Sequence, residues 1–218
     1  MQTDLKYIHQ YIDNQISSFE EFENQIITRI DNYGAYKYLY QKTSDVIKEY
    51  GIRDFQRLFT SLYSTQRLKV YNDLESILKL ESGVRYFQGF INKILKRNYI
   101  DIDELHYEER EQVKNFSNLM GNGKLGFGKN TMSQIAHFCK PNKYALSNTK
   151  SQVAIHYFYQ VDVENNYYEF CKYADIIVDK IRKCVEETFN ISLELVFREY
   201  KYVILDDFVE FVYEKINY

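Results

Sequence analysis

The chain contains few residues that would interrupt a helix. Its 218 residues include one proline and eight glycines. Proline removes a backbone donor and clashes with the preceding turn, and glycine destabilises a helix interior, so a sequence with few of both is suited to long helices. Four of the eight glycines fall close together, between positions 121 and 128, which leaves even fewer elsewhere. We therefore expect an all-α protein rather than a turn-rich β fold.

The spacing of apolar residues agrees with this expectation. Apolar side chains recur three and four positions apart in most segments, as Leu5, Ile8 and Ile12 do near the start, which is the pattern of an amphipathic helix. Gly51 is expected to end a helix covering residues 35–50. Hydrophobic residues make up 45% of the chain, which is enough for a buried core in a single domain covering residues 1–218.

Charge is unevenly distributed along the chain. The net charge of −3 gives no sign of a polyanionic partner. Residues 112–160, however, contain no Asp, Glu or Arg and carry six lysines, at positions 114, 124, 129, 140, 143 and 150. A basic segment in an otherwise acidic protein is suited to a local contact with a nucleic acid.

The cysteines and the N-terminus indicate the compartment. Cys139, Cys171 and Cys184 are far apart and form no CxxC or CxxH spacing, so we expect reduced thiols, with no zinc site and no disulfide framework. The first residues form no hydrophobic signal core, and no apolar run reaches the roughly 18 residues of a membrane span. These features predict a cytoplasmic protein without membrane association, and nothing in the sequence calls for a cofactor or a metal.

The glycine-rich segment GNGKLGFGKNT, residues 121–131, lies between two predicted helices. Glycines allow close approach of another backbone, and a helix that starts after Gly128 directs free N–H groups toward an anion. Lys124 and Lys129 add positive charge to this position. The alternative is a plain helix–helix loop in which the glycines only relieve crowding.

The segment and the residues after it resemble the helix-hairpin-helix DNA glycosylase superfamily, which has the endonuclease III-like fold. The family hairpin reads L-P-G-V-G-x-K-T-A, and Leu125, Gly126, Gly128 and Thr131 match it, although Gly126 stands where the family often has Pro. The resemblance implies two helical lobes around a cleft. We expect the lobe with the hairpin to cover about 103–160 and the remaining helices to come from 1–102 and 161–218.

The resemblance breaks at the catalytic positions. The family's lysine position falls on Asn130, and its aspartate position, eighteen residues later, falls on Asn148. An amide has no basicity, and loss of a general base removes about 10²–10⁴ in rate. Catalysis would then depend on Asn148 holding a water, with Asn130 or the adjacent Lys129 at the lysine position. The family's iron–sulfur cluster is excluded, because only Cys171 and Cys184 lie near the C-terminus.

Three functions are compatible with these residues. The first is a DNA-binding protein on the glycosylase-like scaffold that senses modified or damaged bases, in repair or in defence against foreign DNA. The second is an active, divergent, monofunctional DNA glycosylase that hydrolyses the N-glycosidic bond of an altered base. The third is a protein-interaction module without a nucleic-acid role. For the first, the predicted contacts with the duplex backbone are Lys124, Gly126, Gly128, Lys129, Asn130, Thr131, Lys143 and Lys150.

Overall fold

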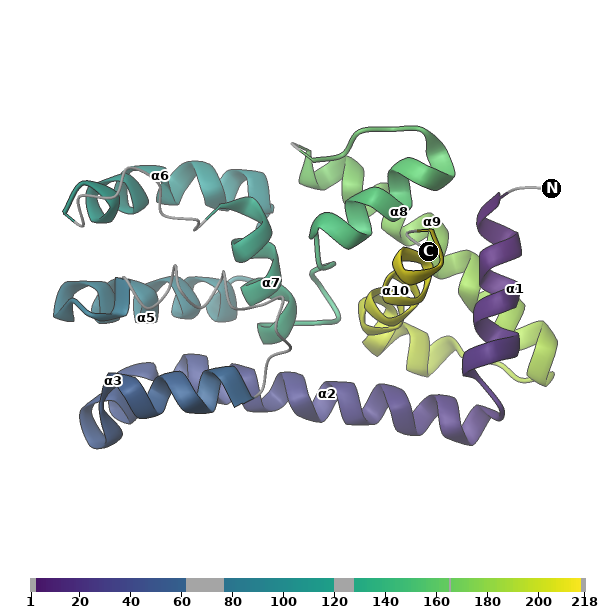
Figure 1. Cartoon of the computed structure of the whole chain (residues 1–218), viewed down its shortest axis with the longest axis horizontal. Helices are drawn as coiled ribbons and strands as arrows, with labels where there is room; N and C mark the ends of the chain where they lie inside the picture. Colours follow the sequence, from purple (N-terminus) through teal and green to yellow (C-terminus); the bar gives the residue numbers. More distant parts are fainter. Residues whose placement is uncertain (1–2, 62–76, 120–127, 165, 217–218) are drawn as a thin grey trace. The chain divides into compact units, whose positions relative to one another are not determined.

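The computed structural model describes residues 3–61, 77–119, 128–164 and 166–216. In these ranges the chain is helical and contains no β-strand (Figure 1). The prediction of an all-α protein is confirmed. None of the helices in the described ranges has the length and apolar character needed to cross a membrane.

The helices form two compact units. One, here called the N/C unit, joins Met1–Asp31 to Lys140–Tyr218, and the other, the central unit, is Asn32–Cys139. Helix α2 (Phe19–Gln41) contributes its first part to the N/C unit and its last part to the central unit. The segment 103–160, predicted as part of one lobe, is divided between the two units.

The N/C unit is built around the C-terminal helix. It contains α1 (Thr3–Gln15), the start of α2, α8 (Thr149–Tyr159), α9 (Tyr167–Phe189) and α10 (Glu194–Ile216). Helix α10 packs against α1, α8 and α9. A helix with neighbours on several sides needs apolar residues around most of its circumference. The run Tyr202–Leu205 is accordingly buried at every position, although its short apolar pattern could be mistaken for a strand.

Polar residues define the ends of α8 and α9. Asn166 accepts a hydrogen bond from the Glu169 backbone N–H at 2.9 Å and so caps the start of α9. Gln160 and Asn190 end α8 and α9 in the left-handed region, with φ of 55° and 53°. Such caps satisfy backbone groups that have no partner within the helix. Both helices therefore begin and end without glycine or proline.

The central unit packs α7 against two longer helices. It contains the end of α2, α3 (Thr43–Ser61), α5 (Glu81–Lys96), α6 (Ile102–Leu119) and α7 (Lys129–Cys139). Helix α7 contacts α5 and α6, and α3 contacts α5. Aromatic pairs fill the core, such as Tyr36 stacked on Phe138 with ring centroids 4.8 Å apart. Every residue of α7 from Thr131 to Cys139 is buried.

Helix boundaries near Gly51 differ from the prediction in part. The predicted helix over 35–50 is divided between α2 and α3, which are separated only by Lys42. Gly51 does interrupt α3, with φ 80° and ψ 167°, a conformation essentially restricted to glycine. The sequence has no glycine or proline next to Lys42 that would predict this break.

Candidate nucleic-acid interface

The predicted contact residues are distributed over both units. Lys124 and Gly126 lie outside the described residues. Gly128, Lys129, Asn130 and Thr131 lie at the start of α7 in the central unit. Lys143, Asn148 and Lys150 lie before and at the start of α8 in the N/C unit. The two predicted catalytic positions, Asn130 and Asn148, are therefore in different units.

The first residues of α7 differ in their exposure to solvent. The Met132 N–H donates to the Gly128 carbonyl at 3.0 Å, so the helical hydrogen bonds begin at Gly128. A Cβ at Gly128 would meet nothing within 4 Å, so other side chains do not crowd this position. Asn130 is exposed, whereas Thr131 is buried at 5% exposure. Asn130 therefore faces solvent, while Thr131 packs toward the interior.

Lys129 is paired with a carboxylate of the neighbouring helix. Its Nζ forms an ion pair with Oδ1 of Asp103 in the first turn of α6, and both side chains are partly exposed. The contact fixes the Lys129 ammonium group beside α6. A lysine whose Nζ contacts a carboxylate would have to leave that contact before it could attack a sugar carbon, which makes Lys129 a poor candidate for the nucleophile of a lyase step.

Asn148 caps α8. Its backbone is extended (φ −134°, ψ 176°), and its Oδ1 accepts a hydrogen bond from the Ser151 N–H at 2.9 Å. The Ser151 hydroxyl in turn accepts from the Asn148 N–H at 2.9 Å, which completes a capping box. Asparagine and aspartate cap helices about equally well. The amide at position 148 therefore supports the local structure as an aspartate would, without a negative charge.

A carboxylate from α10 nevertheless reaches the first turn of α8. Oε1 of Glu210 lies 2.8 Å from Nζ of Lys150, two residues after Asn148. Oε2 of the same side chain lies 3.8 Å from Nη2 of Arg29 on α2. Both oxygens of this carboxylate are therefore engaged in ion pairs within the protein. Glu210 is thus better placed to anchor α8 than to activate a water.

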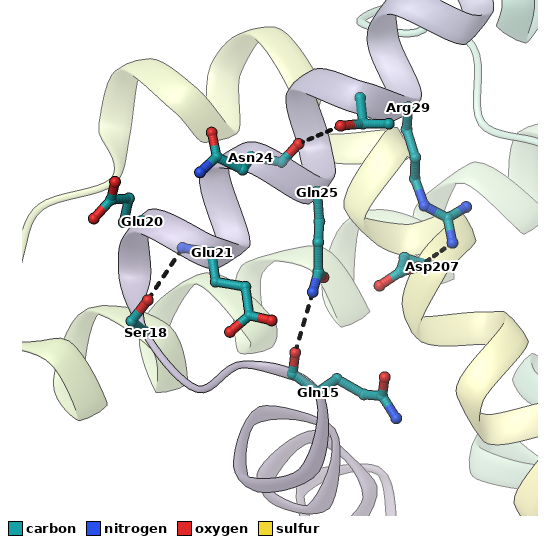
Figure 2. Close-up of a pocket in the computed structure, with 9 residues that line it drawn as sticks. Gln15, Ser18, Glu20, Glu21, Asn24, Gln25, Arg29 and Asp207 are labelled. Atoms are coloured by element: carbon teal, nitrogen blue, oxygen red, sulfur yellow. Dashed lines mark hydrogen bonds and ion pairs between the residues drawn. The ribbon is translucent and has the colours of Figure 1, made fainter.

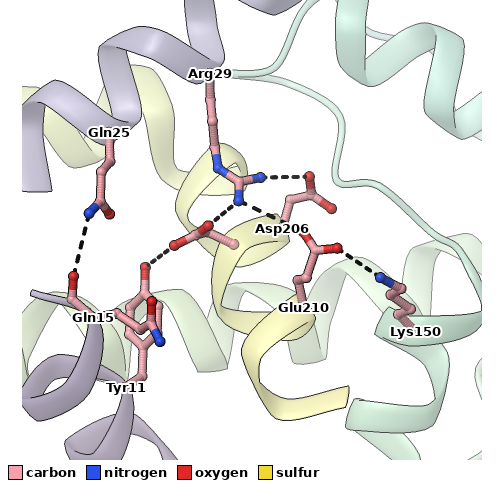
Figure 3. Close-up of polar contacts among 8 residues, drawn as sticks. Tyr11, Gln15, Gln25, Arg29, Lys150, Asp206 and Glu210 are labelled. Carbon is pink, nitrogen blue, oxygen red and sulfur yellow. Dashed lines mark hydrogen bonds and ion pairs between the residues drawn. The ribbon is translucent and has the colours of Figure 1, made fainter. Parts of the chain in front are cut away.

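Glu210 belongs to a larger ion-pair network within the N/C unit, drawn in Figure 3. Arg29 also pairs with Asp207 and lies 3.6 Å from Oδ2 of Asp206. The Tyr11 hydroxyl donates to Oδ2 of Asp207 at 2.6 Å. The network ties α1, α2 and α8 to one face of α10. Its charges are largely compensated internally, so Lys150 adds less free positive charge than the sequence suggests.

Lys143 lies in the turn that precedes α8. Its backbone N–H donates to the Lys140 carbonyl at 3.0 Å, and the Tyr144 N–H donates to the same oxygen at 3.1 Å. This turn contains Pro141, the single proline of the chain. The Lys143 side chain is partly exposed.

A polar pocket on the N/C unit lies beside the Arg29 network (Figure 2). Its volume is about 650 Å³, and its lining comes from the turn between α1 and α2, the first turns of α2, and Asp207 of α10. Several lining residues are already hydrogen-bonded to one another. The Glu21 backbone N–H donates to Ser18 Oγ at 3.1 Å, and the Gln25 side-chain amide donates to the Gln15 carbonyl at 3.4 Å. Glu20, Glu21 and Asp207 outnumber Arg29, so the pocket would repel a phosphate.

Sequence reasoning missed this pocket and its network. Arg29 and Asp207 are 178 positions apart, and neither belongs to a recognisable motif. Only the fold brings them together.

For metals, the described ranges contain no group of three His, Cys, Asp or Glu side chains arranged to hold an ion.

Comparisons with known proteins add no family to this description. No protein-family model, curated protein or solved structure matches the chain. The proposals below therefore rest on the residues themselves and on the motif resemblance.

Proposed function

We propose that the protein binds duplex DNA through its backbone phosphates, on a helix-hairpin-helix glycosylase-like scaffold that no longer carries out standard base excision. The observation that carries the proposal is Asn148. It occupies the position of the family's catalytic aspartate and keeps the helix-capping role that either residue can fill. The charge needed for excision is absent from that side chain, while the structural role is retained.

Three further features support a DNA contact. The first turn of a helix attracts anions through its free N–H groups, and at Gly128, where α7 starts, an added Cβ would meet nothing within 4 Å. Lys124 and Lys129 bring positive charge to this position in the sequence. The division into two helical units is compatible in number with the two lobes that the resemblance implies, although the segment 103–160, expected to form one lobe, is split between the units.

Fluorescence anisotropy with a labelled duplex tests the proposal. Replacing Lys124 and Lys129 together by Glu should weaken binding at least tenfold and flatten its salt dependence. The single Lys124→Glu variant leaves the Lys129–Asp103 pair intact and should show part of the effect. Lys183→Glu, an exposed position on α9 outside the basic segment, makes the same charge change as a control. Equal affinity in all variants, or no binding by the wild type, would favour the protein-interaction module instead.

An active glycosylase is the second candidate, and Glu210 is the observation that favours it. Its carboxylate reaches the first turn of α8, where the family would place its own. The wild type and Glu210→Gln should be incubated with duplexes that contain uracil, 8-oxoguanine or alkylated bases, followed by alkali cleavage. Abasic sites formed by the wild type but not by Glu210→Gln would establish this candidate. Our expectation is that neither protein forms them, because Glu210 is already engaged by Lys150 and Arg29 in ion pairs that anchor α8.

A further inference from the structure

Four side chains of alternating charge follow one another within the N/C unit (Figure 3). Nη2 of Arg29 pairs with Oδ1 of Asp207 and also lies 3.8 Å from Oε2 of Glu210. The second oxygen of Glu210, Oε1, lies 2.8 Å from Nζ of Lys150. One nitrogen of Arg29 is thus shared between two carboxylates, and the carboxylate of Glu210 is shared between two cations.

Shared contacts of this kind make neighbouring pairs compete. The side chains of Arg29, Glu210 and Lys150 are 29%, 44% and 20% exposed, and ion pairs at such partly exposed positions are weak enough to exchange partners. A carboxylate drawn toward Arg29 holds Lys150 less firmly. In the same way, a closer contact between Asp207 and Arg29 leaves Glu210 to Lys150. A change at one end of this series therefore alters how firmly Lys150 is held at the other end.

We propose that Arg29 is a positioning residue for DNA binding, which acts through Glu210 and sets how readily Lys150 exchanges this carboxylate for a DNA phosphate. The inference rests on the proposed function, in which Lys150 is one of the predicted backbone contacts. When Lys150 turns to a phosphate, Glu210 still has Arg29 as a partner. Leaving a charged group without its partner is unfavourable, so the presence of Arg29 lowers the free energy needed to release Lys150.

Substitutions along the series should change the duplex affinity with alternating sign. Arg29→Gln leaves Glu210 to Lys150 alone and should lower the affinity about two- to fivefold, the range expected for one partly exposed ion pair. Asp207→Asn leaves Nη2 of Arg29 to Glu210 and should raise the affinity by a similar factor. Glu210→Gln releases Lys150 altogether, so it should raise the affinity and make the salt slope steeper by up to about one. Fluorescence anisotropy with a labelled duplex measures all three.

A double-mutant cycle separates this mechanism from a general effect of charge, because each substitution also changes the field of the whole protein. In a Glu210→Gln background, Arg29 has no shared carboxylate through which to act on Lys150. Arg29→Gln should then have only the small effect of its control, Arg182→Gln. Arg182 lies on α9 in the same unit, is 30% exposed and pairs with Glu186, so its substitution makes the same charge change away from this series. Circular dichroism checks the folding of each variant.

The outcomes distinguish this inference from the proposed function. A loss of affinity from Arg29→Gln that is equal in the wild-type and Glu210→Gln backgrounds, or no larger than the loss from Arg182→Gln, would overturn the inference alone. Failure of the wild type to bind duplex would overturn both. If Arg29→Gln does not fold, Asp207→Asn in the same two backgrounds decides the question. A gain of affinity in the wild-type background alone supports the role of Arg29, and an equal gain in both backgrounds contradicts it.

Discussion

Asn148 shows how one atom can separate a structural role from a chemical one. The Oδ1 that caps α8 would be present in either Asn or Asp, whereas the charge would be present only in Asp. Selection for folding therefore places no demand on the carboxylate. On the proposed scaffold, a change between Asn and Asp at this position would alter the charge and leave the cap in place.

Replacing Asn148 tests this separation directly. Asn148→Asp should keep the free energy of unfolding within about 0.5 kcal/mol of the wild type, while Asn148→Ala should lose about 1 kcal/mol with the cap. On the proposed scaffold the new carboxylate should also raise base excision by about 10²-fold or more. Urea unfolding and the alkali-cleavage assay measure the two effects. A stable, DNA-binding Asn148→Asp variant that forms no abasic sites would show that the scaffold lacks more than this one carboxylate.

Asp4 is a buried charge in the N/C unit with a clear pH consequence. It is 2% exposed, accepts a hydrogen bond from the Tyr159 hydroxyl at 2.7 Å, and pairs with Lys180. Burial alone would raise the pKa of Asp4, but the hydrogen bonds from Lys180 and Tyr159 and the lysine charge outweigh it and hold the pKa below its usual 3.8. A lowered carboxyl pKa stabilises the fold above the unfolded value, and this stability is lost as the pH falls through the folded value.

Asp4→Asn should therefore remove about 2–3 kcal/mol of stability at pH 7, because hydrogen bonds to a charged group are lost and Lys180 loses its partner. The difference from the wild type should shrink as the pH falls below about 4. Asp13→Asn, at an exposed position on the same helix, serves as the control. Urea unfolding between pH 3 and pH 7 provides the measurement. A difference that stays constant down to pH 3 would contradict the role of this carboxylate.

At the scale of elements, substitutions at two glycines of α5 are predicted to change the stability in opposite directions. A Cβ on Gly83 would overlap the backbone carbonyl oxygen of Ile77, which cannot move as a flexible side chain can. Gly89 lies on an exposed face of the same helix, and a Cβ there would meet nothing within 4 Å. We expect Gly83→Ala to cost about 3 kcal/mol through overpacking and Gly89→Ala to stabilise by about 0.5–1 kcal/mol. Thermal unfolding of the pair tests this; similar changes in both variants would rule out the close approach at Gly83.

Elements were predictable where the signal is local. The scarcity of glycine and proline and the spacing of apolar residues were enough for the all-α class and for the interruption at Gly51. The boundary between α2 and α3 could not be predicted, because the break at Lys42 uses neither residue. Ser151, three residues after Asn148, is a sequence signal for the capping role of Asn148.

Long-range partners were beyond the sequence for a physical reason. Lys150 and Glu210 are 60 positions apart, and Arg29 and Asp207 are 178 apart. An ion pair between a basic and an acidic side chain far apart in the chain leaves no periodic pattern in the sequence, because any of the acidic residues could be the partner. The number of lysines in residues 112–160 follows from the sequence. The pairing of Lys129 with α6 and of Lys150 with α10 depends on the fold.

At the scale of the whole molecule, this neutralisation predicts a weaker salt dependence than the sequence implies. Each neutralised phosphate contributes about −0.9 to the slope of log affinity against log salt, so six lysines would give about −5. Lys129 and Lys150 are already paired with Asp103 and Glu210. A lysine that exchanges a carboxylate for a phosphate changes the ion balance little, so these two pairs together should make the slope shallower than −5 by up to about two.

Anisotropy titrations between 50 and 200 mM NaCl measure this slope. Asp103→Asn frees Lys129 from its intramolecular partner and should make the slope steeper by about one, with tighter binding at low salt. Glu104→Gln, which removes an exposed charge from the neighbouring position of α6, should alter affinity slightly through the general field and leave the slope unchanged. A wild-type slope of about −5 that neither substitution alters would mean that the intramolecular pairs open freely on binding. The positive charge available to DNA would then be set by the sequence count and not by the fold.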